Sequence, residues 1–171
     1  MRSNSVKTRI VPATKKDIPL IRELILALAE YERAVPGDAP VSEQDLAETL
    51  FGEKPAAEVL IAYLDEEAVG FALFFHNYST WLGKRGIYLE DLFVRPAARK
   101  HGVGFALLQE ISRMAVERDC GRVDWSVLNW NELAISFYKR IGAKPMDEWT
   151  TFRLTGKALA DVAARDHARK E

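Results

Sequence analysis

One stretch of the chain decides the fold: residues 87–108, which read IYLEDLFVRPAARKHGVGFALL. The first eight residues are apolar or aromatic apart from Glu90 and Asp91, and such a short run is typical of a buried strand. A basic loop follows, and Gly102 and Gly104 stand where a helix must begin. The stretch therefore predicts a strand, a loop and a helix in direct succession.

The loop and the helix start suit a phosphate group. Glycine lets the backbone approach a ligand without a Cβ in the way, and the first N–H groups of a helix attract anions. Two nucleotide motifs fit poorly, because the dinucleotide fingerprint needs a third glycine where Leu107 stands, and the P-loop needs Gly-Lys where the chain has Gly104-Phe105. Ordinary turn chemistry in a solvated basic loop remains the alternative.

Size and composition indicate one globular domain, residues 1–171. The chain is 48% hydrophobic and 29% charged with a net charge of −1, so we expect no nucleic-acid partner and no membrane association. A single cysteine, Cys120, excludes an internal disulfide and fits the cytoplasm. We see no signal peptide and no apolar stretch long enough to cross a bilayer.

The hydrophobic pattern predicts a mixed sheet with helices on its faces, an α/β or α+β fold. Two capping boxes, Thr14 with Asp17 and Ser42 with Asp45, indicate helix starts. Strands are expected at residues 6–11, 58–64, 68–78, 87–94, 122–128 and 149–154, with a hairpin turn at 65–67 and a loop at 35–40. Helices are expected at residues 18–33, 42–52, 104–118 and 132–141, and an alanine-rich helix closes the chain.

A second group of chemically notable residues lies nearer the C-terminus. Asn131 precedes a short helix that contains Phe137 and Tyr138 and stops at Gly142. A capped helix that packs its apolar side chains inward would explain this pattern without any ligand. Together with Arg-x-x-Gly-x-Gly at residues 99–104, however, the pattern Asn-x5-Phe-Tyr-x3-Gly-Ala resembles the two signatures of the GNAT superfamily of N-acetyltransferases.

Further segments resemble the diamine (spermidine/spermine) N-acetyltransferases and their thialysine-acetylating relatives. They are LAEYE at 28–32, FGE at 51–53, GFA at 70–72, YLED at 88–91, WNE at 130–132 and FYKR at 137–140. The resemblance covers about residues 6 to 160. It implies the GNAT acyl-CoA N-acyltransferase fold, a central mixed sheet flanked by helices, with a middle strand that is bulged and splayed from its neighbour.

The resemblance also implies acetyl-coenzyme A (acetyl-CoA) as co-substrate and no metal. The expected cofactor-binding residues are Leu92, Phe93, Val94, Arg99, Lys100, Gly102, Val103, Gly104, Phe105, Asn131, Tyr138 and Arg140. Backbone N–H groups around residues 92–94 would bond the pantetheine arm and polarise the thioester carbonyl. The Tyr138 hydroxyl would lie near the coenzyme sulfur and protonate, or hydrogen-bond, the leaving thiolate.

The acceptor amine must lose a proton before it attacks the thioester, because a primary alkyl amine with a pKa near 10.4 is protonated at pH 7. We predict that Glu90 takes up this proton, directly or through water, since an unpaired charge inside an apolar strand would be costly; the resemblance implies the same residue. The alternative is a surface Glu90 paired with a cation across the sheet. Alternation puts Glu90 and Asp91 on opposite faces, so both serve one site only if the strand bulges.

Acidic and aromatic residues form the acceptor site that the resemblance implies. They are Tyr31, Glu32, Trp81, Asp91, Asp147 and Trp149. Core packing for the tryptophans and a solvated helix end for Glu32 remain alternatives. The chain has Ser79-Thr80 where the polyamine enzymes carry Asp-Pro, and it lacks their acids after Glu32. Fewer carboxylates attract a polycation less strongly, which favours a small diamine or a thialysine-like amino acid as substrate.

Three other functional classes compete with this interpretation. A protein or peptide N-acetyltransferase would share the cofactor core, whereas a non-catalytic acyl-CoA sensor would not need Glu90 and Tyr138 together. A dinucleotide-dependent oxidoreductase is disfavoured by the missing third glycine. The resemblance further implies a homodimer whose subunits pair through their C-terminal strands and complete each other's acceptor site.

Overall fold

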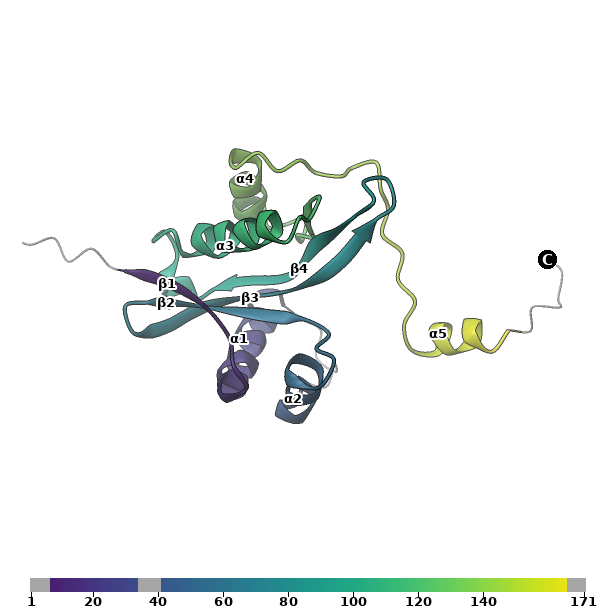
Figure 1. The fold of residues 1–171 in the computed structure, drawn as a ribbon, viewed down its shortest axis with the longest axis horizontal. Coiled ribbons are helices and arrows are strands. Elements are labelled where there is room, and N and C mark those ends of the chain that lie inside the picture. Colours follow the sequence, from purple (N-terminus) through teal and green to yellow (C-terminus); the bar gives the residue numbers. More distant parts are fainter. Residues whose placement is uncertain (1–6, 34–40, 166–171) are drawn as a thin grey trace, which may run out of the picture. The chain divides into compact units, whose positions relative to one another are not determined.

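Five strands form one mixed sheet in the computed structural model, which describes residues 7–33 and 41–165 (Figure 1). The strands are β1 (Thr8–Pro12), β2 (Glu58–Leu64), β3 (Glu67–Ser79), β4 (Lys84–Val94) and β5 (Val123–Trp125), in that order across the sheet. The first four are antiparallel to their neighbours, and β5 runs parallel to β4. The predicted mixed α/β sheet is confirmed.

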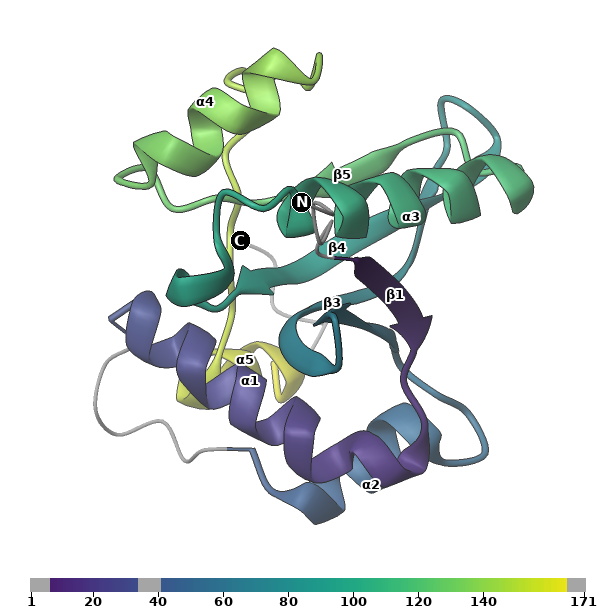
Figure 2. The ribbon, with the colours of Figure 1, turned by 90° about the vertical axis from the view of Figure 1, so that its left-hand side faces the viewer.

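The helices are α1 (Ile18–Tyr31), α2 (Glu43–Phe51), α3 (Val103–Glu117), α4 (Glu132–Arg140) and α5 (Gly156–Ala163). Helices α1 and α2 cover one face of the sheet, and α3 covers the other (Figure 2). The chain divides after Ser126 into two compact units. The first unit holds the sheet with α1–α3, and the second holds α4 and α5. That the whole chain forms one domain stays a prediction.

Local signals in the sequence set several element boundaries. The backbone N–H and hydroxyl of Thr14 donate to the Asp17 carboxylate at 2.7 and 2.8 Å, and a 3-10 turn at this box leads into α1. The N–H of Asp45 donates to the Ser42 hydroxyl at 3.0 Å and opens α2. Both predicted capping boxes are confirmed. Asp65, with φ of 55°, makes the expected tight turn between β2 and β3.

The core on the α1/α2 side fixes the position of β4. Ile21 and Leu24 of α1 pack with Ile61, Phe71 and Phe93 from the three central strands, and all five are buried. Burying each such side chain stabilises the fold by about 1.5–3 kcal/mol. Because Phe93 belongs to this cluster, the C-terminal half of β4 is held against α1.

An extra residue interrupts β4 in its middle. Leu89 pairs with Phe74 and Asp91 pairs with Leu73, so Glu90 has no residue opposite it on β3. On the other side of β4, parallel pairing with β5 ends at Leu89. The strand from Glu90 onward is therefore separated from β5. The bulged and splayed middle strand that the resemblance implies is confirmed.

Two strand predictions need correction. Residues 122–128 were expected to form one strand, but only Val123–Trp125 does so, because its pairing with β4 stops at the bulge. Residues 149–154 form no strand, and within the described ranges no other strand pairs with them. An alternating pattern becomes a strand only where a partner accepts its backbone hydrogen bonds. The expected loop at 35–40 lies outside the described residues.

Candidate functional site

The bulge decides which face of the sheet Asp91 occupies. Tyr88 lies on the face of the sheet that α1 and α2 cover, because it pairs with Phe75, which shares the face of Phe71 by strand alternation. The rings of Tyr88 and Phe75 lie 5.3 Å apart. Strand alternation would place Asp91, three positions later, on the opposite face. The extra residue at Glu90 reverses this, and Asp91 points to the same side as Tyr88 and Phe93. The strand therefore has the bulge that Glu90 and Asp91 need in order to serve one site.

Asp91 and Glu90 have different surroundings. Asp91 is half-buried, and burial, followed by the charges of Glu90 and Glu32, raises its pKa to about 6. Glu90 is exposed. An unpaired charge in this strand is therefore costly at Asp91 and not at Glu90.

The end of α1 supplies a second acid to this region. Glu32 follows the last residue of α1 and is the more exposed of the pair, although partial burial still raises its pKa. Its charge acts on Asp91 across the space between helix and strand. The structure therefore brings together three of the predicted acceptor residues, Tyr31, Glu32 and Asp91.

Arg99 connects the basic loop to α1. Its Cζ lies 4.3 Å from the centroid of the Tyr31 ring, and its Nε donates to the Val94 carbonyl at 3.0 Å. The Tyr31 ring also lies 6.4 Å from that of Phe93. The end of β4, the loop and the end of α1 thus meet at one side chain. No pattern in the sequence predicts the contact between Arg99 and Tyr31.

The glycine loop exposes the backbone of the first turn of α3. Lys100 and Gly102 adopt left-handed conformations, with φ of 69° and 78°. The Ala106 N–H donates to the Gly102 carbonyl at 2.9 Å, so the N–H groups of residues 103–105 have no acceptor within α3. A Cβ placed on Gly104 would come no nearer than 3.8 Å to Val94 Cγ2. This open first turn can hold an anion.

The remaining predicted cofactor-binding residues of the loop and of β4 differ in whether their side chains or only their backbone groups can contact a ligand. Val103 is buried and presents only its backbone, whereas Lys100 and Phe105 are exposed. Leu92, Phe93 and Val94 lie on the part of β4 that β5 leaves unpaired. Within the described residues no cluster of three or more His, Cys, Asp or Glu side chains could hold a metal ion.

Trp81 lies apart from the acids Glu32 and Asp91. It is 92% exposed in the turn between β3 and β4. Asp91 lies seven residues beyond Lys84, the first residue of β4, and a strand advances about 3.3 Å per residue, which separates the turn from Asp91 by roughly 20 Å. Within one chain Trp81 therefore does not join Glu32 and Asp91.

The other predicted site residues belong to the second compact unit, which begins at Val127. The Asn131 side chain accepts from the Ala134 N–H at 3.2 Å and caps α4. The rings of Phe137 and Tyr138 lie 5.3 Å apart. Arg140 is in the last turn of α4, and Asp147 and Trp149 are exposed beyond it.

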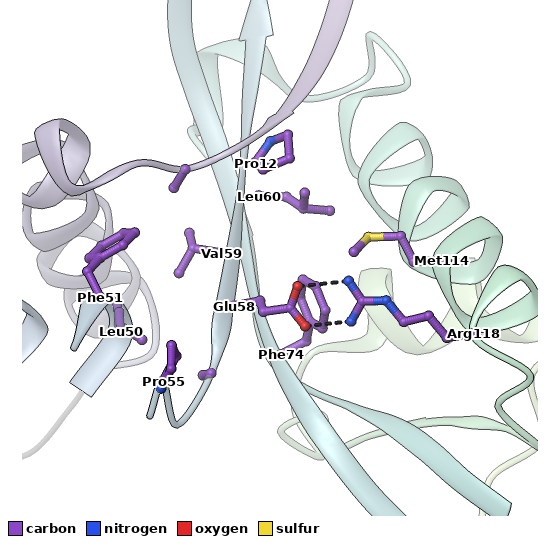
Figure 3. Close-up of a pocket in the computed structure, with 12 residues that line it drawn as sticks. Pro12, Leu50, Phe51, Pro55, Glu58, Val59, Leu60, Phe74, Met114 and Arg118 are labelled. Carbon is purple, nitrogen blue, oxygen red and sulfur yellow. Dashed lines mark hydrogen bonds and ion pairs between the residues drawn. The ribbon is translucent and has the colours of Figure 1, made fainter. Parts of the chain in front are cut away.

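A separate pocket of about 250 Å³ lies beside the start of β2 (Figure 3). Its polar groups are the carboxylate of Glu58 and the guanidinium of Arg118, which bond each other at 2.5 and 2.8 Å. This hydrogen bonding lowers the pKa of Glu58. The two charges satisfy each other, and the other residues that line the pocket are mostly apolar. We therefore take the bulge in β4, and not this pocket, as the candidate site. The sequence did not indicate the pocket.

A profile of the Acetyltransferase (GNAT) family matches residues 24–143. The chain belongs to this family. It is similar to the thialysine N-epsilon-acetyltransferase of Mus musculus, with 34% identity over 169 residues, covering 92% of this chain and 98% of the relative. It is also similar to the L-ornithine N5-acetyltransferase of Arabidopsis thaliana, with 33% identity, covering 91% of this chain and 87% of the relative.

A solved structure agrees with this assignment. An integron cassette protein from the mobile metagenome of V. cholerae superposes with a TM-score of 0.76 at 29% identity, covering 92% of this chain and 98% of that one. The GNAT fold and the N-acetyltransferase class expected from the sequence are confirmed. No helix in the described part of this GNAT enzyme is long and apolar enough to cross a membrane.

Proposed function

We propose that this GNAT enzyme transfers the acetyl group of acetyl-CoA to the primary amine of a small aminoalkyl substrate, a diamine or polyamine or an amino acid such as thialysine or ornithine. The amine attacks the thioester directly in a ternary complex. The observation that carries the proposal is the β4 bulge, which brings the half-buried acid Asp91 to the face that α1 covers. The same strand ends at Val94, which neighbours the open first turn of α3 at residues 102–105.

The coenzyme phosphates would rest on the N–H groups of residues 103–105. The open space at Gly104 and the left-handed Gly102 fit this role. Arg99 and Lys100 add positive charge at the same loop. The unpaired edge of β4 at residues 92–94 would bond the pantetheine arm and polarise the thioester carbonyl. Asn131, Tyr138 and Arg140 complete the cofactor set that we propose.

The reaction requires one proton to leave the substrate and one to reach the sulfur. A carboxylate at the bulge takes up the ammonium proton, and we propose Glu90 for this role. The neutral nitrogen then forms a bond to the acetyl carbon while the carbon–sulfur bond breaks. The Tyr138 hydroxyl donates to the departing thiolate. General acid and base groups of this kind contribute about 10²–10⁴-fold each.

The acids near α1 support a small cationic substrate. Glu32 and Asp91 give the acceptor region a local negative charge that attracts an ammonium group. The two named relatives act on thialysine and ornithine, amino acids that end in a primary amine. A short aliphatic chain ending in an amine is therefore the substrate class that we propose.

We also propose that the enzyme works as a homodimer in the cytoplasm, where the single Cys120 stays reduced. The segment that the sequence predicted as a strand, residues 149–154, has no strand partner within the described residues. Its Trp149 and Phe152 side chains are 72% and 91% exposed. A second copy of the chain could supply the missing partner and bring Asp147, Trp149 and Trp81 to an acceptor site. Sedimentation as a monomer at micromolar concentration would overturn this part.

An acceptor screen tests the proposed function. The purified enzyme is given acetyl-CoA and either a diamine, thialysine, ornithine or a lysine-containing peptide, and free thiol is measured with time. We expect thiol release with the small amines and little release with the peptide. Preference for the peptide would favour a protein acetyltransferase. Tight acetyl-CoA binding without thiol release for any amine would favour a sensor.

A further inference from the structure

We propose that Arg122, which directly precedes β5, and Asp124 in the middle of β5 bind the amino-acid head of the acceptor substrate, its α-carboxylate and α-ammonium. The enzyme then prefers an amino acid that ends in a primary amine to a diamine. The inference rests on the proposed function and selects one substrate class within it.

Asp124 lies in the row of residues next to Asp91, on the sheet face that α1 and α2 cover. On β3, Leu73 pairs with Asp91. Two residues further along, Phe75 pairs with Tyr88, and Asp124 pairs with Tyr88 from the other side. Rows on one face are about 7 Å apart and neighbouring strands about 4.8 Å, so the backbones of Asp91 and Asp124 are roughly 8–9 Å apart.

The guanidinium of Arg122 reaches the row of Asp124. Its Nε lies 2.7 Å from Asp124 Oδ2. A Cβ added to Gly86 would lie 3.2 Å from Arg122 Cγ and 2.4 Å from Asn77 Oδ1. The Arg122 side chain therefore passes beside Gly86, which has no side chain to block it. Its charge ends beside Asp124, one row from Asp91.

Asn77 holds Asp124 in this position. Its Nδ2 donates to Asp124 Oδ2 at 3.1 Å, across β4 from β3 to β5. Its Oδ1 is buried and has no hydrogen-bond partner in the described part of the chain, which costs stability. Among residues 7–33 and 41–165, no hydrogen bond engages Asp124 Oδ1 or the two Nη groups of Arg122. These groups remain for a ligand, and a role in fixing them explains the cost at Asn77.

An arginine–aspartate pair that is partly open to solvent matches the head of an amino acid. The side chains of Arg122 and Asp124 are 42% and 34% exposed, and an ion pair this exposed contributes little to folding. The guanidinium can bind the α-carboxylate with two parallel hydrogen bonds, and Asp124 can accept from the α-ammonium. A diamine has no carboxylate for Arg122, whose charge repels its second ammonium.

The length of such a substrate agrees with the spacing of the rows. In extended ornithine or thialysine, the terminal nitrogen and the carboxylate carbon are roughly 6–8 Å apart, because successive bonds are about 1.5 Å long. With the amine at the bulge beside Asp91, the aliphatic chain would lie over Phe75 and Tyr88, whose half-buried rings are 5.3 Å apart. The carboxylate would then meet Arg122.

The test compares ornithine with diaminobutane, the diamine that ornithine becomes when its carboxylate is removed. Thiol release at saturating acetyl-CoA gives kcat/KM for each amine. For the wild type we expect a preference for ornithine of about 10- to 150-fold, the range for a hydrogen bond to a charged group.

Arg122→Gln should lower kcat/KM for ornithine about 10- to 150-fold, mainly through KM, because the lost contact is remote from the reacting atoms. The value for diaminobutane should stay the same or rise. Arg122→Lys keeps the charge and should recover part of the loss. Arg113→Gln on α3 removes another exposed, ion-paired arginine and is the matched control, which should change neither substrate.

Ornithine methyl ester, which lacks the negative charge, should be insensitive to Arg122→Gln. Equal losses with ornithine and diaminobutane would show that Arg122 supports the fold and does not read the substrate. No loss with either amine, or a wild type without a preference for ornithine, would also overturn the inference.

The outcomes separate this inference from the proposed function. A wild type that releases no thiol with any amine would overturn both. A wild type that acetylates diaminobutane and ornithine, and whose preference is the same in Arg122→Gln, would overturn only the role of Arg122 and Asp124.

Discussion

The guanidinium of Arg99 lies over the ring of Tyr31, with its Cζ 4.3 Å from the ring centroid. This contact joins the loop that we assign to the coenzyme phosphates to the last residue of α1, which Glu32 follows. Its strength should be about 0.5–2 kcal/mol, the range for cations on aromatic faces. Substitutions at Tyr31 should therefore affect the coenzyme loop from a distance.

Tyr31→Leu should weaken acetyl-CoA binding about 2- to 30-fold, because Arg99 loses the surface that holds it in place. Tyr31→Phe keeps the ring and should bind almost as the wild type does. Calorimetric titration with acetyl-CoA measures both. Equal affinities for the Leu and Phe variants would show that the contact does not position Arg99.

Gly104→Val should reduce acetyl-CoA affinity at least 100-fold, since a branched side chain would stand where the phosphates approach the backbone. The folded chain has room for the added Cβ, whose nearest neighbour is Val94 Cγ2 at 3.8 Å. Thermal unfolding should accordingly stay near that of the wild type. Gly104→Ala gives an intermediate case, and binding that is unchanged in both variants would remove this loop from the cofactor site.

Tyr138→Phe should lower kcat while acetyl-CoA affinity is retained, because the ring that contacts Phe137 stays and only the hydroxyl is lost. A thiol pKa near 8.5 makes the thiolate a tolerable leaving group, so we expect a loss near the lower end of the range of about 10²–10⁴-fold. Steady-state kinetics with a small amine measures it. A wild-type kcat would exclude the hydroxyl as the proton donor.

Asp91→Asn should stabilise the fold at alkaline pH. A group whose pKa is higher in the folded than in the unfolded chain lends stability at low pH and loses it as pH rises, here between pH 3.8 and about 6. Above this range the ionised Asp91 costs up to about 1–3 kcal/mol, which Asn does not. Urea unfolding at pH 8 and pH 4 should show a gain for the variant that is larger at pH 8. A gain that is independent of pH would contradict the burial of this carboxylate.

Signals that act over a few residues were sufficient to predict much of the fold. The capping pairs at Thr14 and Ser42 and the turn at Asp65 depend on neighbours three residues away or fewer. The segment at 149–154 could not be predicted in this way, because a strand exists only if another segment pairs with it. The same holds for the early end of β5, which follows from the bulge in β4.

In the candidate site, too, features that depend on neighbouring residues could be predicted, and features that depend on distant segments could not. The glycine loop was recognised from local spacing, and the bulge was expected from the resemblance. The environments of Glu90 and Asp91 could not be predicted from their shared strand, since the one extra residue at Glu90 moves Asp91 to the other face of the sheet. The contact between Arg99 and Tyr31 joins residues far apart in the sequence and has no local signature.

We propose above all that the enzyme acetylates the terminal amine of a small aminoalkyl substrate. The most direct measurement is a competition in which thialysine, ornithine, a diamine and a lysine-containing peptide share one reaction with acetyl-CoA, and mass spectrometry identifies the acetylated products. We predict that the acetyl group appears on the terminal amine of the small molecules, in amounts that match the thiol released. Acetylation of the peptide in preference to all of them would contradict the account.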